Sequence, residues 1–414
     1  MKVVTKREFE VSPRRGVRLM AEAEEVVKPI IEAVATRGDE ALWEYAKRFD
    51  GYEGRSFVAT PDELARAARS VSSSFLDAVE VARTNIGAFA RAQLPKDFMI
   101  ELGPGHRVGQ IVRPIKTAAA YVPGGRYPMP STVLMTCVPA LVAGVPDIWV
   151  TSPKADAHID AVAGALGIKN VCRLGGAHAI AAFAFGTESI PRSDRIVGPG
   201  NIYVSAAKKL LAGQVGIEFV AGPTEVLIIA NDGSPAWIAA DILAQCEHDP
   251  DAAAYLVTTS LDLAKQVVAE IESQLANLPT ASIAKQSLAE NSAIILVDSD
   301  QEAVDFANET APEHLCLHHP GLLPNIVNAG SVFLGAYTPE AAGDYVTGPN
   351  HVLPTGGAAR NTGGLSVHHF LKVISVQELE PSALQSISTA GAELARAEGL
   401  EAHARSIEIR QEAR

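Results

Sequence analysis

Cysteine and long apolar runs are scarce in this sequence, and each shortage excludes a class of protein. The 414 residues include four cysteines, which are widely spaced and form no C-x-x-C pair. A disulfide framework or a cysteine-ligated zinc site is therefore a poor interpretation, and a reducing compartment is favoured. The longest apolar run, residues 131–150, carries Pro139, Pro146 and Asp147. That run suits a buried helix leading into a strand rather than a membrane span.

Positive charge is also in short supply. Lys and Arg number 35 against 48 Asp and Glu, which gives a formal net charge of -13. Proteins that hold nucleic acid must neutralise phosphates, so this balance argues against such a partner. The N-terminus shows no apolar core followed by a small-residue cleavage site. We therefore expect a cytoplasmic protein that acts on a small-molecule substrate, with neither nucleic acid nor a membrane as a partner.

The patterning that is present indicates an α/β protein of more than one domain. A single hydrophobic core stops growing at roughly 250–300 residues, and this chain is longer. Residues 20–48 and the stretch after Pro61 show helical periodicity. From residue 110 onward, short β-rich runs alternate with Ala-rich helical patterns, and a second such series begins at Glu225. This alternation is typical of parallel sheets covered by helices, and the two series could share an architecture.

A carboxylate and an imidazole stand side by side at Glu313-His314, just before an apolar run. Histidine has the side-chain pKa nearest neutrality, and the glutamate can orient it or act separately on water. Such a dipeptide is common by chance, so its catalytic interpretation depends on residues elsewhere in the chain.

Four other segments supply ligand-type side chains. Gln245 and His248 are three residues apart at a helix end, so both project from one face. Asp344 lies in the long Gly/Pro-rich loop 335–366, and His403 lies on a polar terminal helix. The alternatives are a helix-end histidine, turn chemistry and a surface histidine, respectively. Taken together, these four residues form a mixed N/O set that suits zinc or manganese.

Three glycine turns, at residues 121–125, 175–178 and 198–201, each fall between a strand and a helix. Ligands bind α/β sheets at such turns, where helix N-termini offer N–H groups to phosphates. The strict G-x-G-x-x-G fingerprint is absent. Tight turns that need positive φ remain the alternative, and they explain one such turn more easily than three.

In their order, and along nearly the whole chain, eight motifs resemble those of the histidinol dehydrogenase family. They are residues 121–125 (YVPGG), 184–189 (AFGTES), 198–201 (GPGN), 221–226 (AGPTEV), 245–250 (QCEHDP), 311–315 (APEHL), 343–345 (GDY) and 348–355 (GPNHVLPT). The resemblance implies a zinc-dependent homodimer that performs the last two steps of histidine biosynthesis. Those steps are two NAD-dependent oxidations, from alcohol through aldehyde to acid.

The resemblance also implies a role for individual residues. It makes Glu313 and His314 the catalytic acid/base residues. The implied zinc ligands, which also contact substrate together with His314, are Gln245, His248, Asp344 and His403. Further substrate contacts are Thr224, His351 and Glu398, and the cofactor contacts are Tyr121, His178 and Asn201. The C-terminal segment would cross to the partner, so that Glu398 and His403 complete the other subunit's site.

The expected fold is two incomplete Rossmann-like domains, one inserted in the other, with helical N- and C-terminal dimerisation segments. We assign residues 1–20 to an N-terminal segment, 21–115 with 222–365 to a first α/β domain with the metal and catalytic residues, 116–221 to an inserted nucleotide-binding domain, and 366–414 to the C-terminal helical dimerisation segment.

Two departures from the family pattern leave the substrate open. His178 stands where the family usually has Gln, and His368-His369 replaces a more usual Tyr-Asp. The alternatives to histidinol oxidation are a paralogue acting on another small polar alcohol and, from a different class, a zinc hydrolase.

Overall fold

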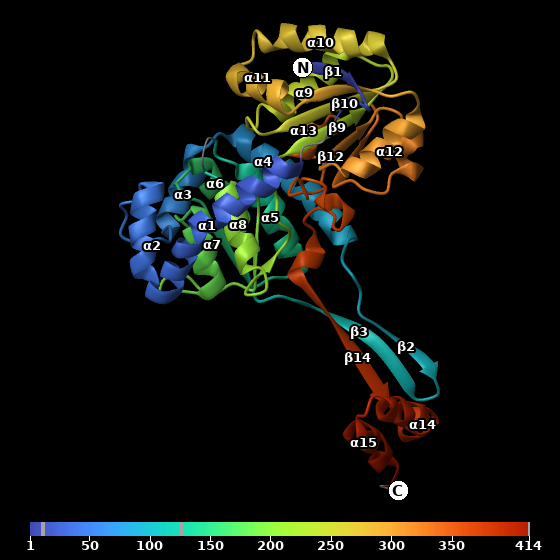
Figure 1. Ribbon diagram of the computed structural model, residues 1–414. Helices are drawn as coiled ribbons and strands as arrows, with labels where there is room; N and C mark the ends of the chain where they lie inside the picture. Colours follow the sequence, from blue (N-terminus) through green and yellow to red (C-terminus); the bar gives the residue numbers. More distant parts are fainter. Residues whose placement is uncertain (10–12, 125–126, 413–414) are drawn as a thin grey trace. The chain divides into compact units, whose positions relative to one another are not determined.

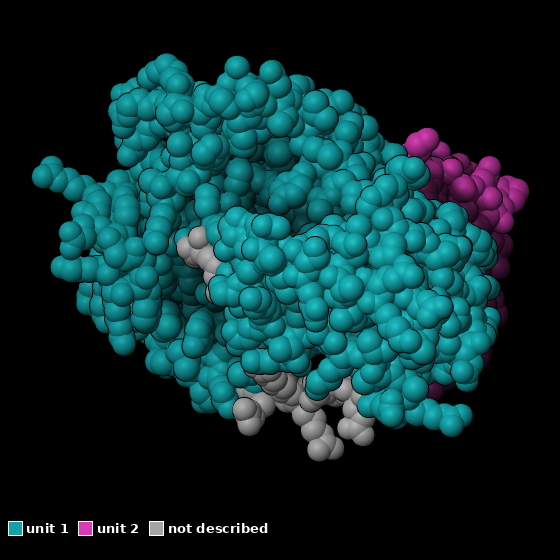
Figure 2. Space-filling model, turned by 90° about the horizontal axis from the view of Figure 1, so that it is seen from above, with its two compact units in different colours: residues 1–93, 116–370 teal, residues 94–115, 371–414 magenta. Residues whose placement is uncertain are grey.

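The computed structural model describes residues 1–9, 13–124 and 127–412, shown as a ribbon in Figure 1. The chain divides into two compact units, coloured separately in Figure 2. Unit 1 comprises residues 1–93 and 116–370, and unit 2 comprises residues 94–115 and 371–414.

Unit 1 contains a five-stranded parallel sheet with the strand order β6-β5-β4-β7-β8. Its strands are β4 (Thr117–Tyr121), β5 (Asp147–Thr151), β6 (Asn170–Cys172), β7 (Arg195–Val197) and β8 (Gly216–Ile217). The intervening helices are α5 (Pro130–Ala143), α6 (Ala157–Ala165), α7 (Gly176–Phe185) and α8 (Ile202–Leu211). Every residue of β4 is buried, as expected for the central strand of a sheet covered on both faces.

The N-terminal helices pack on this five-stranded sheet. They are α1 (Pro13–Arg37), α2 (Asp39–Tyr45), α3 (Pro61–Ser70) and α4 (Ser73–Ala92). The predicted helix start at Pro61 is confirmed, and Thr60 and Glu63 form a capping box there. Helix α1 packs on α7 and α8, α3 on α6, and α4 on α5. One core joins Val27 and Ile31 to Phe183, so these helices lie with the sheet that we had expected to be a separate insertion.

Unit 1 also contains a six-stranded parallel sheet in the order β1-β11-β10-β9-β12-β13. Its strands are β1 (Lys2–Thr5), β9 (Glu225–Ile229), β10 (Ala253–Thr258), β11 (Ala293–Leu296), β12 (His314–Leu317) and β13 (Ser331–Leu334). Val226 and Ile228 of β9 share a core with α9 (Pro235–Cys246), α10 (Leu261–Leu275) and α11 (Ala281–Glu290). Leu227 and Ile229 face the other way, toward α12 (Asp300–Thr310). The predicted α/β class with parallel sheets is therefore confirmed.

The two sheets share a strand order, as the sequence suggested they could. In each, the first strand of the series is central, the second and third lie on one side, and the fourth and fifth lie on the other. The six-stranded sheet adds β1 at one edge, where Lys2 to Thr5 pair with Ala293 to Leu296. The expectation of a helical N-terminal segment is thus wrong for these residues, because the chain completes a sheet edge there.

Unit 2 is a three-stranded antiparallel sheet followed by two helices. The sheet order is β14 (Leu371–Leu379), β3 (His106–Pro114) and β2 (Phe98–Gly103), and the helices are α14 (Pro381–Ala397) and α15 (Glu401–Glu412). The two predicted terminal helices are confirmed. Two expectations are corrected: residues 110–114 pair with β14 and do not open the parallel series, and the supposedly helical C-terminal segment begins with a nine-residue strand.

Among the residues described, no helix combines the length and apolar character needed to cross a membrane. The four cysteines are buried free thiols.

Candidate active site

The predicted acid/base pair lies where the strands of the six-stranded sheet begin. We call this side, formed by the amino-terminal ends of the strands, the amino edge, and the opposite side the carboxyl edge. Glu313 immediately precedes β12 and His314 is its first residue, while Thr224 and Glu225 occupy the same edge at β9. The two strands are neighbours, with His314 opposite Val226. Glu313 is 5% exposed and His314 is 4% exposed, so both residues are buried.

Glu313 is held by two hydrogen bonds. Its Oε2 accepts from Thr224 Oγ1 at 2.6 Å and from the backbone N–H of Glu225 at 2.9 Å. Burial raises the pKa of Glu313 to about 8, although both hydrogen bonds act to lower it. Burial and the charge of Glu313 likewise raise the pKa of Glu225 to about 7. This edge of the sheet thus concentrates carboxyl groups that can change protonation state near neutral pH.

His314 has a defined tautomer. Its Nδ1 lies 3.1 Å from the carbonyl oxygen of Glu225, which can only accept a hydrogen bond. Nδ1 therefore carries a proton and donates, which leaves Nε2 as the basic nitrogen. The ring also packs near Phe333, with 5.9 Å between ring centroids.

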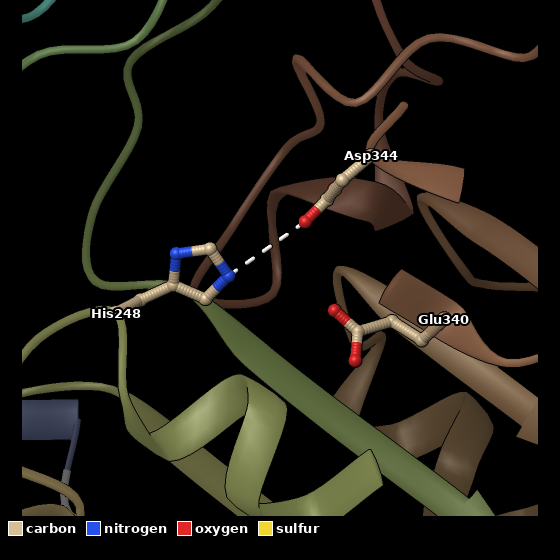
Figure 3. Close-up of side chains that lie close together, drawn as sticks. All are labelled: His248, Glu340 and Asp344. Carbon is tan, nitrogen blue, oxygen red and sulfur yellow. Dashed lines mark ion pairs between the residues drawn. The ribbon is translucent and has the colours of Figure 1, made fainter. Parts of the chain in front are cut away.

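Near this pair lies a cluster of side chains that could bind a metal ion, His248, Glu340 and Asp344, which we call the metal-type cluster. His248 follows the end of α9, and Glu340 and Asp344 lie at the start and just past the end of the short helix α13 (Glu340–Gly343). One ligand atom from each residue lies within 4.8 Å of the others, and His248 Nε2 is 3.6 Å from Asp344 Oδ2. Figure 3 shows the three side chains directed toward a common space.

The pKa shifts of the His248–Asp344 pair favour the charged forms. The carboxylate of Asp344 raises the pKa of His248, against the effect of burial. Burial alone would raise the pKa of Asp344, but His248 and the nearby His351 and His314 lower it overall. Zinc takes an ionised carboxylate and a neutral imidazole as ligands, so a metal bound here would replace the proton of His248.

Gln245 completes the cluster from the last turn of α9, where it is fully buried. One end of its amide lies 3.0 Å from Glu340 Oε1, and the other end lies 2.8 Å from Thr224 Oγ1 and 3.2 Å from Glu225 N. Because Glu225 N can only donate, we assign the amide oxygen to that end and the NH2 group to Glu340. Two of the four predicted ligands, His248 and Asp344, are therefore brought together by the fold, and their N and O donors fit zinc. Gln245 packs against Glu340 of the same cluster, and its part as a ligand stays a prediction.

Sequence reasoning missed Glu340. It is 1% exposed, burial raises its pKa to about 7, and its Oε2 has no hydrogen-bond partner in the described chain. Two signals could have identified it: Pro339 before it is typical of a helix start, and Asp344 four residues later lies on the same helical face.

His351 joins the long loop to the five-stranded sheet. Its Nδ1 lies 3.0 Å from the carbonyl oxygen of Asp344, and its Nε2 lies 3.3 Å from Thr132 Oγ1 on α5. Burial lowers the pKa of His351, which favours the neutral ring. The imidazole thus fixes the backbone at Asp344, and its role as a substrate contact stays a prediction.

The predicted cofactor residues line the same large cleft as Thr224 and His248. The cleft has a volume of about 3040 Å³, and Figure 2 shows unit 1 hollowed on the face turned toward the viewer. The five-stranded sheet contributes Tyr121, His178 and Asn201, and the six-stranded sheet contributes Thr224 and His248. Strands β4, β6 and β7 present their carboxyl ends on this side, where the predicted glycine turns follow them.

The glycine turns are closely packed. Gly198 has a φ of 113°, and a Cβ at this position would lie 2.2 Å from the carbonyl oxygen of Tyr121. Only glycine allows this approach. Tyr121 Oη accepts a hydrogen bond from Gly176 N at 3.0 Å, and Asn201 caps α8 by accepting from the N–H groups of Tyr203 and Val204.

His178 pairs with a residue that the sequence did not indicate. Its Nε2 lies 2.9 Å from Asp50 Oδ2, which also accepts from Gly175 N at 2.9 Å. Since a carboxylate accepts, Nε2 carries the proton and Nδ1 is an acceptor. Nδ1 is buried and has no partner among the described residues. Asp50 comes from the end of the π-helical turn after α2, far from α7 in sequence, so no local pattern could have indicated it.

Two predicted site residues belong to unit 2. Glu398 follows the last residue of α14 and His403 lies on α15, and both are exposed. Their proposed participation in the site stays a prediction. Of the predicted departures, His369 Nδ1 accepts from Ser366 N at 3.1 Å, and burial lowers its pKa to about 4. The His369 side chain therefore stabilises the local turn that begins at Ser366.

Comparison with known proteins identifies related sequences. A family model described as histidinol dehydrogenase matches residues 14–411. A histidinol dehydrogenase from Geobacter sulfurreducens is 45% identical over 97% of this chain and 96% of that protein. One from Synechococcus is 46% identical over 93% of this chain and 92% of its own length.

Solved structures agree with the sequence comparison. The crystal structure of histidinol dehydrogenase from Elizabethkingia anophelis is similar with a TM-score of 0.91 and 38% identity, over 94% of this chain and 92% of that one. An acetylating aldehyde dehydrogenase from Geobacillus thermoglucosidasius has a TM-score of 0.51 at 14% identity, covering 88% of this chain and 95% of that one, which shows a shared fold alone.

Proposed function

The chain belongs to the histidinol dehydrogenase family, and we propose that it oxidises L-histidinol through L-histidinaldehyde to L-histidine with zinc and two NAD. One observation supports this proposal beyond the family: His248, Thr224 and Glu225 line one cleft with the glycine turns of the other sheet, and Glu313 is hydrogen-bonded to Thr224 and Glu225. A candidate metal ligand, the hydrogen-bond partners of Glu313 and turns suited to phosphate thus border one cavity.

Zinc, when bound by Gln245, His248 and Asp344, would hold the amine and imidazole of the substrate and act as an orienting Lewis acid. NAD, when bound beside Tyr121 and Asn201, would accept hydride. The remaining chemistry belongs to side chains of this chain. We propose that His403 of the partner subunit supplies the fourth ligand.

His314 is the base for the alcohol. Its Nδ1–H is fixed on the carbonyl oxygen of Glu225, so Nε2 can take the hydroxyl proton. Burial of the ring excludes competing water. Each oxidation releases one proton from oxygen, so His314 serves both halves of the reaction.

Glu313 acts on water between the two oxidations. The aldehyde must be hydrated before a second hydride can leave, and hydration requires removal of a proton from water. Thr224 Oγ1 and Glu225 N hold one carboxylate oxygen of Glu313, which leaves the other for this water. Its raised pKa makes it a stronger base than an exposed glutamate once ionised.

We also propose a homodimer with shared active sites, located in the cytoplasm. In the described part of unit 2, the core cluster between the helices consists of Ala392, Ala395 and Ala404, and Ala383 is also buried. Large apolar side chains remain exposed on its sheet and helices, including Met99, Ile100, Leu102, Val373, Ile374, Ile387, Leu394 and Ile409. So many exposed apolar side chains on a small unit suit a protein partner, and we propose a second copy as that partner.

The test is NADH formation. With L-histidinol as substrate, zinc-loaded protein should yield two NADH and one histidine per substrate molecule. A paralogue would reduce NAD with a different small polar alcohol, and a zinc hydrolase would cleave amides or esters without reducing NAD. Absence of NADH formation with histidinol would reject the proposal.

A further inference from the structure

Glu340 is a buried carboxylate to which the proposed reaction assigns no step. It is the first residue of α13, and 1% of it is exposed. Oε1 faces the Gln245 amide at 3.0 Å, while Oε2 has no hydrogen-bond partner in the part of the chain described. Buried oxygens of this kind are nearly always paired, so an unpaired one requires an explanation.

The carboxylate is directed at the metal-type cluster. One of its oxygens lies within 4.8 Å of the ligand atoms of both His248 and Asp344. In Figure 3 it is turned toward the same space as the histidine ring and the aspartate. An ionised carboxylate without a counter-charge is unfavourable in a buried position, and a divalent cation in this space would remove that penalty.

Glu340 also controls the orientation of Gln245. The two ends of an amide have nearly the same shape, so packing alone does not decide which end carries the oxygen. A carboxylate accepts hydrogen bonds and therefore selects the NH2 group at its own end. Ligands of metal ions are commonly fixed in this way by an outer carboxylate.

We infer that Glu340 is a positioning residue of the metal site, which orients the Gln245 amide and places a negative charge beside His248 and Asp344 that strengthens metal binding. The inference rests on the proposed function, because that function supplies the metal. A purely structural carboxylate that only ties α13 to α9 is the competing explanation.

The two explanations differ in the metal-free protein. If Glu340 is structural, Glu340→Gln lowers the unfolding temperature even without metal. If it serves the metal, the same change removes a buried charge with an unpaired oxygen, so the metal-free unfolding temperature stays the same or rises. Zinc affinity, measured by competition with a chromophoric chelator, then falls by roughly 10- to 100-fold, the usual effect of losing an outer partner. The zinc-induced rise in unfolding temperature shrinks in proportion to the logarithm of that loss.

Glu247→Gln is the matched control. It makes the same charge change one residue before His248, but the Glu247 carboxylate accepts from Thr280 Oγ1 at 2.6 Å and lies outside the cluster. Wild-type zinc affinity is expected for this variant.

Wild-type zinc affinity in Glu340→Gln would overturn the inference. If that variant does not fold, Glu340→Asp decides, since it keeps the charge but withdraws it by one methylene. Several-fold weaker zinc binding is expected for Glu340→Asp, and unchanged binding would reject the role. Wild-type protein that holds no zinc would instead reject the proposed metal dependence, and the inference with it.

Discussion

The five-stranded and six-stranded sheets share a strand order but present their functional residues at opposite edges. In the five-stranded sheet, the glycine turns and Asn201 follow the carboxyl ends of β4, β6 and β7. In the six-stranded sheet, Thr224, Glu313 and His314 lie at the amino ends of β9 and β12. The same topology therefore supports two different kinds of site.

Helix direction explains the difference. A crossover helix starts at the carboxyl edge of a parallel sheet and ends at the amino edge, so the first edge collects helix N-termini and the second collects C-termini. The N-termini of α7 and α8 suit the phosphates of a dinucleotide. The C-terminus of α9 adjoins His248, where the Asp344 carboxylate adds negative charge, and Glu225 and Glu313 add carboxyl groups that ionise near neutral pH. That edge suits a cation.

The largest expected effect is loss of the cation. His248→Ala or Asp344→Ala should abolish stoichiometric zinc binding and lower histidinol oxidation on the order of 10³-fold, since a Lewis acid supplies several kcal/mol of stabilisation. NAD binding by the isolated variants should persist, because the carboxyl edge of the other sheet is untouched. Metal analysis and equilibrium NAD binding check this. Full zinc occupancy in both variants would reject the ligand assignment.

Within the amino edge, Glu313 and His314 should separate by half-reaction. Glu313→Gln is expected to retain much of the alcohol-to-aldehyde step while slowing aldehyde oxidation about 10²- to 10⁴-fold, the usual contribution of a positioned base. His314→Asn should slow both steps, because each needs a proton acceptor. Single-turnover assays started from histidinol and from histidinaldehyde measure the two halves. Equal losses in both halves for Glu313→Gln would remove the division of labour.

At the carboxyl edge, Asp50→Asn should weaken NAD binding roughly five- to tenfold, because His178 then loses a hydrogen bond to a charged group. Zinc affinity should not change, which would show that the two edges act independently. Asp39→Asn is the control, since Asp39 accepts hydrogen bonds from Thr187 and Ser189 and does not line the cleft. Equal NAD affinity in wild type and Asp50→Asn would show that the pair does not serve the cofactor.

Local sequence patterns predicted the parts of this molecule whose causes are local. Alternating β-rich and Ala-rich runs predicted most strands and helices of both parallel sheets, though not β1, β8 or α11, and Pro61 predicted the start of α3. The motif resemblance predicted that Gln245, His248 and Asp344 converge; His248 and Asp344 lie in one cluster with Glu340, and Gln245 contacts Glu340. Their roles as ligands stay predictions.

Partners distant in sequence could not be predicted in this way. Lys2 to Thr5 give no sign that they pair with β11, and residues 106–114 do not indicate an antiparallel partner at 371–379. Asp50 and Glu340 acquire significance through the side chains that the fold places beside them, His178 and Gln245. Periodicity reports which face of an element is buried, but not what buries it.

The smallest expected effect is a partial recovery of activity, which tests whether a second chain supplies residues to the site at the amino edge. Glu398 follows α14 and His403 lies on α15, two helices whose shared core cluster consists of three alanines. If they serve the partner's site, His314→Ala and His403→Ala should each be inactive alone. In a mixed dimer one site then carries both lesions and the other carries neither. Random reassembly makes about half the dimers mixed, so activity should recover to roughly a quarter of wild type. The control is an equal mixture of His314→Ala with His248→Ala, two changes proposed to affect the same chain's site, which leave no intact site in a mixed dimer. Subunit exchange that is demonstrated by mass spectrometry yet restores nothing to the first mixture would show that His403 acts within its own chain.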